Sequence, residues 1–182
     1  MANRLACELN FTSLRAFAAV SGPLVLQNDT TKGVPAVVCD RVQRGLPPVP
    51  LLHIHGLRDP IVPFGGCNST WASFGEACVF LHVRNPSLAP FPDVATYVDE
   101  WRRRNGQKHN SKKTTTFENN TVTCVSTGEK ENNVTLCTAS EEGHSWPGGN
   151  VGCSKFAPQL NCTNDIDASQ VTWNFFESLA LQ

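Results

Sequence analysis

Two residues that lie far apart in the sequence, Asp59 and His144, have the types and surroundings of an acid–base pair. Asp59 follows the apolar stretch 49–55, and Pro60 and Pro63 restrict the loop that carries it. His144 follows a second strand-like stretch and precedes a Trp-Pro-Gly-Gly turn. A carboxylate that accepts the Nδ1 proton of a histidine leaves Nε2 free to take a proton from a serine hydroxyl. The pattern predicts the orienting acid and the general base of a nucleophilic hydrolase.

A purely structural role is the alternative for each of these residues. A single histidine near a strand end is commonly a hydrogen-bonded structural residue, and a loop aspartate commonly closes a turn. His53 and His55 are two residues apart in the strand predicted over 49–55, so both lie on one face of it, either in the core or near the site. We predict Trp146, Phe64 and His55 as residues of a pocket for an aromatic or apolar acyl group, with ordinary packing as the alternative.

The elements that must position these residues alternate between helix and strand patterns. Helices are predicted over 2–9, from Asp93 to Asn105 and from Asp167 onward, and strands over 16–21, 49–55 and within 113–139. This alternation predicts the α/β class, with a mostly parallel sheet covered by helices on both faces. Neither a repeat nor a low-complexity tract divides the chain, so residues 1–182 are interpreted as a single domain.

Two of the predicted helices carry an apolar stripe that indicates a buried face. In the first, the stripe consists of Val94, Tyr97, Val98 and Trp101. In the second, it consists of Val171, Phe175 and Leu179, after a capping box formed by Asp167 and Gln170. These stripes are expected to contribute to the core.

Cysteines and glycosylation sequons both indicate a secreted, disulfide-stapled protein. The eight cysteines favour disulfides, with Cys124 and Cys137 as candidates for one bridge and Cys7 and Cys39 for another. No CxxC or HxxxH pair is present, so neither a metal nor another cofactor is expected. Candidate glycosylation sites are Asn10, Asn28, Asn68, Asn119, Asn133 and Asn161, whereas chance would provide about two such triplets.

Charge and hydropathy exclude two classes of partner. The chain has 15 basic and 16 acidic residues, a formal net charge of −1, which favours neither nucleic acid nor an anionic membrane. The longest apolar stretches are too short to span a bilayer. The first 17 residues lack the apolar stretch of a signal peptide and begin directly in a helix pattern, so we expect the true N-terminus to lie further upstream.

Several ordered blocks of the sequence together resemble the C-terminal half of the secreted polyhydroxybutyrate depolymerase and feruloyl esterase family. The blocks are RLACEL at 4–9, VPLLHIHGLRDPIVPFGG at 49–66, the helix end at 101–105, TTTF to VTC at 114–124, VTLCTASEEGHSWPGG at 134–149 and DIDASQVTWNFF at 165–176. These enzymes are α/β-hydrolase esterases. The resemblance covers nearly the whole chain and implies a partial α/β-hydrolase fold.

The resemblance also implies site residues. The acid of the family's HGxxDxxVPxxGG motif falls on Asp59, and the base of its GGHxWPGG motif falls on His144. Glu142 stands where the second motif has its first glycine. The serine, acid and histidine order of α/β-hydrolases agrees with 59 before 144.

The resemblance breaks down at the nucleophile. In the family, the helix that resembles residues 2–9 directly follows a GxSxGG elbow, whereas no GxSxG occurs in this chain. Ser145, beside the histidine, lacks the elbow that exposes a nucleophile. The oxyanion-hole amides are expected upstream as well, so the chain alone is expected to be inactive.

These observations predict a secreted serine carboxylic-ester hydrolase, present as an incomplete α/β-hydrolase domain that lacks its N-terminal strands and elbow. Its expected partner is an ester substrate, either polyhydroxyalkanoate or feruloylated or acetylated polysaccharide. The alternative is a non-catalytic secreted protein, derived from the esterase fold, that binds polyester or carbohydrate. The substrate, the oligomeric state and the full set of disulfides are left open by the sequence.

Overall fold

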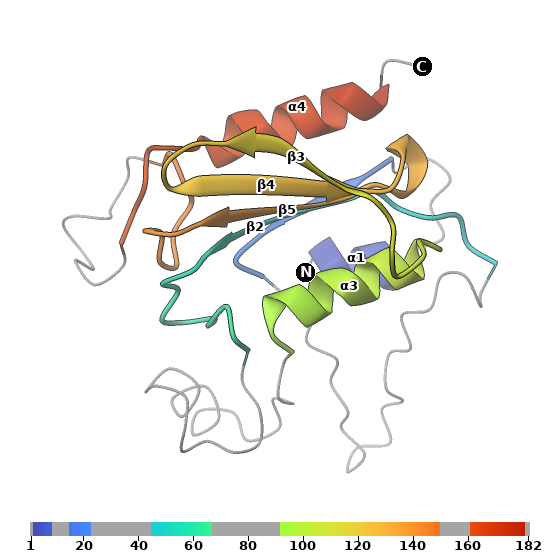
Figure 1. Cartoon of the computed structure of the whole chain (residues 1–182), viewed down its shortest axis with the longest axis horizontal. Helices are drawn as coiled ribbons and strands as arrows, with labels where there is room; N and C mark the ends of the chain where they lie inside the picture. Colours follow the sequence, from blue (N-terminus) through green and yellow to red (C-terminus); the bar gives the residue numbers. More distant parts are fainter. Residues whose placement is uncertain (1, 9–14, 23–44, 67–91, 150–160, 181–182) are drawn as a thin grey trace, which may run out of the picture.

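A computed structural model of the chain describes residues 2–8, 15–22, 45–66, 92–149 and 161–180. Its elements are α1 (Ala2–Glu8), β1 (Phe17–Val20), β2 (Leu51–Gly56), α3 (Val94–Arg104), β3 (Lys113–Glu118), β4 (Val122–Thr127), η2 (Lys130–Asn132), β5 (Val134–Ala139) and α4 (Ala168–Ala180). The described residues form three layers, with α1 and α3 below a five-stranded sheet and α4 above it (Figure 1). The α/β class and the coverage of both faces are confirmed.

The sheet is mixed rather than mostly parallel, which corrects the prediction from the sequence. Its strand order is β1-β2-β5-β4-β3; β1, β2 and β5 pair in parallel, whereas β4 is antiparallel to both β5 and β3. Two short connections reverse the chain: residues 128–133 between β4 and β5, and a turn at Asn119, whose Oδ1 accepts hydrogen bonds from the backbone N–H groups of Thr121 and Val122. This side-chain turn reverses the chain and makes β3 and β4 a hairpin.

Strand β2 is buried along its whole length because parallel neighbours lie on both of its edges and helices lie on both faces. Leu51 packs into a cluster with α1 and α3, whereas Leu52 and Ile54 pack into a second cluster below α4. The period of two along the strand assigns alternate side chains to the two clusters. As a result, His53 and His55 share the α3-facing side with Leu51.

Helix α3 forms as its sequence predicts. Asp93 caps it, its Oδ1 accepting the Thr96 N–H at 2.8 Å, and the predicted stripe is fully buried. At the other end, Asn105 leaves the helix and its side chain bonds both the N–H and the carbonyl of Val49. These two bonds anchor the end of α3 to the residues that lead into β2.

Helix α4 begins at the predicted capping residue, but the Gln170 side chain donates to Asn174 Oδ1 rather than completing the predicted capping box, and the helix packs less tightly than predicted. Asp167 Oδ1 accepts the N–H groups of Ser169 and Gln170, as a cap should. Of its described residues, only Ala168 is fully buried, and the predicted stripe is half-buried. A cavity of about 560 Å³, partly open to solvent, lies between part of the helix and the sheet; its lining includes Phe117, Val171, Phe175 and Leu179. The short residues of the sheet below, such as Ser126 and Thr135, do not fill this space.

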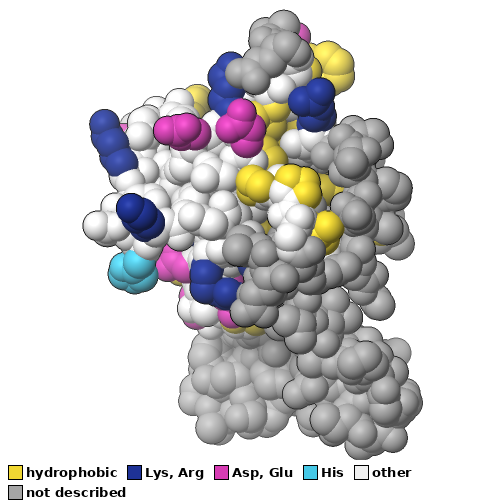
Figure 2. Space-filling view, turned by 90° about the vertical axis from the view of Figure 1, so that its right-hand side faces the viewer, with side chains coloured by type: hydrophobic (Ala, Val, Ile, Leu, Met, Phe, Trp, Pro, Cys, Tyr) yellow, Lys and Arg dark blue, Asp and Glu magenta, His cyan; other side chains and the backbone are white. Residues whose placement is uncertain are grey.

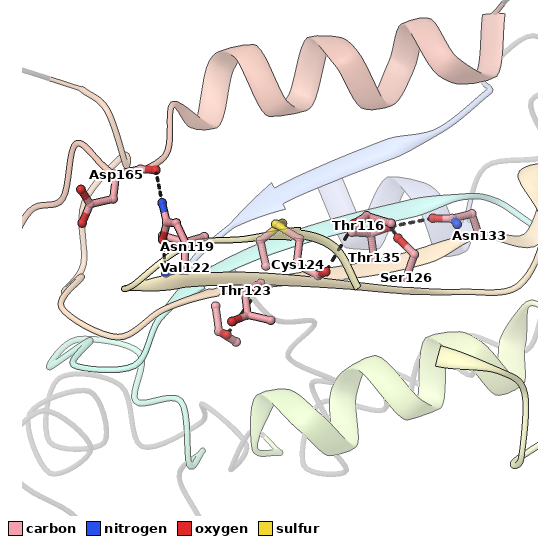
Figure 3. The surroundings of a disulfide bond; sticks show 11 residues. Thr116, Asn119, Val122, Thr123, Cys124, Ser126, Asn133, Thr135 and Asp165 are labelled. Atoms are coloured by element: carbon pink, nitrogen blue, oxygen red, sulfur yellow. Dashed lines mark hydrogen bonds between the residues drawn. A yellow bond between two sulfur atoms is a disulfide. The ribbon is translucent and has the colours of Figure 1, made fainter. Parts of the chain in front are cut away.

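A disulfide joins Cys124 to Cys137, as predicted. The two residues are directly opposite each other in the β4–β5 ladder, which brings their Cβ atoms within reach. The bond lies on the α4 side of the sheet, along the same face as the hydrogen-bonded hydroxyls of Ser126 and Thr135 (Figure 3). Cys7 is also disulfide-bonded, but Cys39 lies outside the described residues, so their pairing stays a prediction.

The described residues on the side of the molecule shown in Figure 2 show no preference for one charge. Acidic and basic side chains are interspersed on the side shown in Figure 2, with hydrophobic side chains exposed between them. None of the helices in the described ranges is both long and apolar enough to cross a membrane.

Candidate functional site

Asp59 and His144 are in contact, with His144 Nδ1 lying 2.8 Å from Asp59 Oδ2. Their loops follow β2 and β5, which are parallel neighbours whose last residues, Gly56 and Ala139, are directly paired. Both loops therefore leave the sheet at the same edge, the carboxyl end of the strands, where α/β proteins place their sites. The pairing of β2 with β5 thus brings together two residues that are 85 positions apart in the sequence.

The close approach of the two loops depends on Gly56. A Cβ atom there would lie 2.3 Å from the carbonyl oxygen of Glu142 and 2.5 Å from that of Gly143. The backbones are joined further by hydrogen bonds from Leu57 N to Ala139 O at 2.9 Å and from Arg58 N to Glu142 O at 3.0 Å. The ladder thus continues beyond the strands and fixes the distance between the two loops.

The Asp59 side chain is buried and both of its oxygens are occupied. Oδ1 accepts the N–H groups of Ile61 and Val62, each at 2.8 Å, and Oδ2 accepts Nδ1–H of His144. Burial raises the pKa of Asp59, but the hydrogen bond from His144, together with those from Val62 and Ile61, outweighs burial and lowers this pKa overall. The carboxylate is therefore kept charged.

The His144 imidazole is oriented on one side and open on the other. Its hydrogen bond to Asp59 raises the pKa of His144, and burial opposes this effect only in part. The side chain is 36% exposed, and within the described ranges Nε2 has no hydrogen-bond partner. With Nδ1–H donated to Asp59, the lone pair of Nε2 is available to accept a proton.

A buried carboxylate, Glu142, supports the loop that carries His144. It is completely buried and accepts hydrogen bonds from the hydroxyl of Ser145 and from the backbone N–H of Thr163. Burial raises the pKa of Glu142, and these two hydrogen bonds counteract the rise. The resemblance indicated only that Glu142 stands where the similar motif has a glycine, and a glutamate is ordinarily exposed, so its supporting role could not be predicted from the pattern.

The Ser145 hydroxyl is occupied by this carboxylate. Because it donates to Glu142 rather than to His144, Ser145 is not arranged as a nucleophile. This arrangement agrees with the absence of an elbow around it in the sequence.

The structure brings two of the three predicted pocket residues together. The rings of His55 and Phe64 lie 5.8 Å apart, edge to face, with His55 fully buried and Phe64 half-buried. Trp146 is 50% exposed and donates Nε1–H to Ser169 Oγ at 3.0 Å. No contact between Trp146 and the other two is found in the described part of the chain. The pocket role of all three stays a prediction.

Three of the glycosylation candidates are among the described residues. Asn119 and Asn161 are exposed, whereas Asn133 is half-buried and accepts a hydrogen bond from the hydroxyl of Thr135, its own sequon threonine. Asn10, Asn28 and Asn68 lie outside the described residues. Glycosylation stays a prediction at all six.

Among the residues with described positions, no group of three or more histidine, cysteine, aspartate or glutamate side chains is arranged to hold a metal ion. No known protein family matches the chain, and no curated protein or solved structure matches it either.

Proposed function

We propose that the chain is the acid–base half of a secreted serine carboxylic-ester hydrolase of the α/β-hydrolase type. The observation that carries this proposal is the 2.8 Å contact between His144 Nδ1 and the buried, doubly bonded carboxylate of Asp59. A histidine held in this way, with Nε2 open, is the arrangement that activates a serine hydroxyl. The substrates we propose are polyhydroxyalkanoate or ester groups of plant cell walls, on the resemblance of the motifs around both residues.

The proposed reaction uses His144 twice. Nε2 takes the proton of the serine hydroxyl as the serine oxygen bonds to the ester carbonyl carbon, and Asp59 stabilises the imidazolium that forms. Nε2–H then protonates the leaving alcohol oxygen as the ester C–O bond breaks. A water molecule repeats the sequence on the acyl-enzyme, with its proton passing through Nε2 to the serine as the acid is released.

The serine of this proposal comes from outside the 182 residues. No GxSxG occurs in the sequence, and the hydroxyl of Ser145 is bonded to Glu142. We therefore expect the chain alone to be inactive and a longer chain, with an elbow upstream of Met1, to be active.

Reading the transcript upstream of codon 1 tests the proposal. We expect an in-frame GxSxG, and the longer chain should hydrolyse p-nitrophenyl acetate with its activity lowered about 10³-fold or more by the elbow Ser→Ala or by His144→Ala. A matched control is His109→Ala, since His109 is exposed and lies in the connection between α3 and β3, outside the two loops of the site. Absence of the motif, or equal rates for the longer chain and its His144→Ala variant, contradicts the proposal.

The second candidate is the non-catalytic binding protein, and exposed aromatic rings favour it. Trp146 is 50% exposed and Trp173, on α4, is 63% exposed. Exposed indoles are suited to stacking on sugar rings or lying on apolar polymer. Co-sedimentation of the 182-residue chain with polyhydroxybutyrate granules or arabinoxylan tests it, with Trp146→Ala and Trp173→Ala as variants. Equal sedimentation of both variants and the unaltered chain contradicts this candidate.

A further inference from the structure

Two buried histidines on β2, His53 and His55, have no part in the mechanism proposed above. Both side chains are completely inaccessible to solvent, on a strand that is otherwise apolar. Burying an imidazole without hydrogen bonds is costly, so a residue of this type in a core calls for an explanation. Their hydrogen bonds provide one.

The bonds fix which nitrogen of each ring carries a proton. His55 Nε2 lies 2.8 Å from the carbonyl oxygen of Val62, and a carbonyl only accepts, so Nε2 of His55 is protonated. The Nδ1 atom of the neutral His55 ring is then an acceptor, and His53 Nε2, 3.0 Å away, must donate to it. A directed chain runs from His53 through His55 to Val62.

Val62 belongs to the loop that holds the site carboxylate. Its N–H donates to Asp59 Oδ1 at 2.8 Å while its carbonyl accepts from His55. The backbone of Val62 is therefore bonded to the strand through its carbonyl and to the carboxylate through its N–H. His55 Nε2 is also 3.6 Å from Asp59 Oδ2, the oxygen that faces His144.

We propose that His53 and His55 are positioning residues that hold the Asp59 loop, and with it Oδ2, in line with His144. The inference deepens the proposed function and rests on it for the catalytic consequence alone. The directed chain gives His55 the task of clamping Val62, and gives His53 the task of holding the His55 ring through Nδ1. Alternation along β2 is what places the two rings side by side.

The surroundings keep both rings neutral, as the chain of bonds requires. The Tyr97 and His53 rings pack edge to face with their centroids 5.0 Å apart, and Phe64 packs on His55. Burial, followed by the proximity of His55, lowers the pKa of His53 to about 3. Burial also lowers the pKa of His55, although the Val62 carbonyl and Asp59 oppose the change and His144 adds to it.

NMR of the 182-residue chain tests the proposal without needing catalysis. Imidazole ¹⁵N spectra should show His55 as the Nε2–H tautomer in the unaltered chain. In His55→Leu, which removes the donor to Val62, the titration midpoint of His144 should fall toward that of Asp59→Asn. His55→Gln keeps an N–H at the same reach and should restore most of the difference.

The second position provides an independent arm. In His53→Leu, His55 Nδ1 loses its donor and the ring is held by Val62 alone, so the titration midpoint of His144 should move in the same direction as in His55→Leu but by less, whereas His53→Gln should retain the midpoint of the unaltered chain. The control is Val98→Ala, a core truncation on α3 that lowers the melting temperature and should leave the His144 midpoint and the His55 tautomer unaltered.

Either of two results overturns the proposal: an unchanged His144 midpoint in folded His55→Leu, or the same midpoint in His55→Gln and His55→Leu. If His55→Leu does not fold, the His55→Gln, His53→Leu and His53→Gln chains decide the matter; a His144 midpoint in His53→Leu equal to that of the unaltered chain then overturns the proposal. A longer chain without activity would contradict the esterase proposal alone, because the spectra of the 182-residue chain do not depend on catalysis.

Discussion

The carbonyl oxygen of Glu142 lies 2.3 Å from the place that a Cβ atom on Gly56 would occupy. Gly56 is the last residue of β2, and Glu142 lies two residues before His144. The contact between these two backbones is what allows Asp59 and His144 to meet at the carboxyl end of the sheet. A side chain at Gly56 would have to move backbone atoms, because the contacting groups are carbonyls.

Gly56→Ala is therefore expected to destabilise the fold by about 3 kcal/mol, the cost of forcing extra volume into a packed site. Urea unfolding measures this change. Gly106→Ala is a matched glycine with open space around its Cβ position, although its φ of 74° adds backbone strain there. A larger loss at Gly106 than at Gly56 would contradict the packing argument.

Asp59→Asn should lower the pKa of His144, because the hydrogen bond to the Asp59 carboxylate is the main cause of its elevation. A titration of the His144 Hε1 resonance by NMR measures this. Glu141→Gln, which changes an exposed carboxylate in the same loop, is the control. An equal downward shift in both variants would assign the elevation to general charge rather than to Asp59.

The same pair makes a pH-dependent contribution to stability. The pKa of His144 is raised on folding, so this part is complete below about pH 6.5 and is lost as pH rises through the folded value. The pKa of Asp59 is lowered, so its part is present above about pH 3.9 and is lost as pH falls further. The difference in unfolding free energy between the unaltered chain and Asp59→Asn should therefore peak between about pH 4 and about pH 6.5; a peak above pH 8 would contradict this prediction.

His53 affects the pH dependence of stability in the sense opposite to His144, because its pKa is lowered on folding rather than raised. Its folded pKa of about 3 lies below its ordinary value, so in the window between the two values the unfolded chain binds a proton that the folded chain does not. Stability should fall by up to about 1.4 kcal/mol per pH unit as pH decreases through that window, starting near 6.5. His53→Gln, which does not titrate, should flatten this limb in acid-unfolding curves. An unchanged slope in that variant would show that other groups produce it.

Glu142→Ala should cost about 1–3 kcal/mol, since it leaves the Ser145 hydroxyl and the Thr163 N–H without their acceptor inside the fold. Glu141→Ala is the neighbouring control: its carboxylate is half exposed and pairs with Arg58 at the surface, so we expect a loss within about 0.5 kcal/mol. Thermal unfolding of the two variants compares them directly, and equal losses would remove the case for Glu142 as a supporting residue.

Removing the Cys124–Cys137 disulfide, as Cys124→Ala with Cys137→Ala, should lower the free energy of unfolding by about 3 kcal/mol, given its sequence separation of 13 residues; urea unfolding measures this change.

The half-buried stripe of α4 should contribute less to stability than the core of α3. Val171→Ala is thus expected to cost under about 1 kcal/mol and Val98→Ala about twice as much, in urea unfolding. A reversed order would mean that α4 packs more closely on the sheet than the cavity below it indicates.

Local sequence patterns were sufficient to predict features that depend on residues within a single helix or strand. The cap at Asp93, the buried stripe that follows it and the capping residue Asp167 could be predicted because helix ends and helix faces depend on residues a few positions apart. The burial of β2 followed from its apolar residues for the same reason. The turn at Asn119 was missed because its amide bonds to nearby N–H groups inside a stretch that otherwise reads as one strand.

The sequence by itself determined which two residues are the candidates for the acid and the base, since an aspartate and a histidine after two strands can be recognised from type and order alone. Only the tertiary structure decided that the two strands are neighbours, that Gly56 lets their loops touch, and that Glu142 and the two histidines of β2 support them. The physical reason is that strand pairing and side-chain burial depend on contacts between distant parts of the chain, and a linear pattern contains no distance between Asp59 and His144.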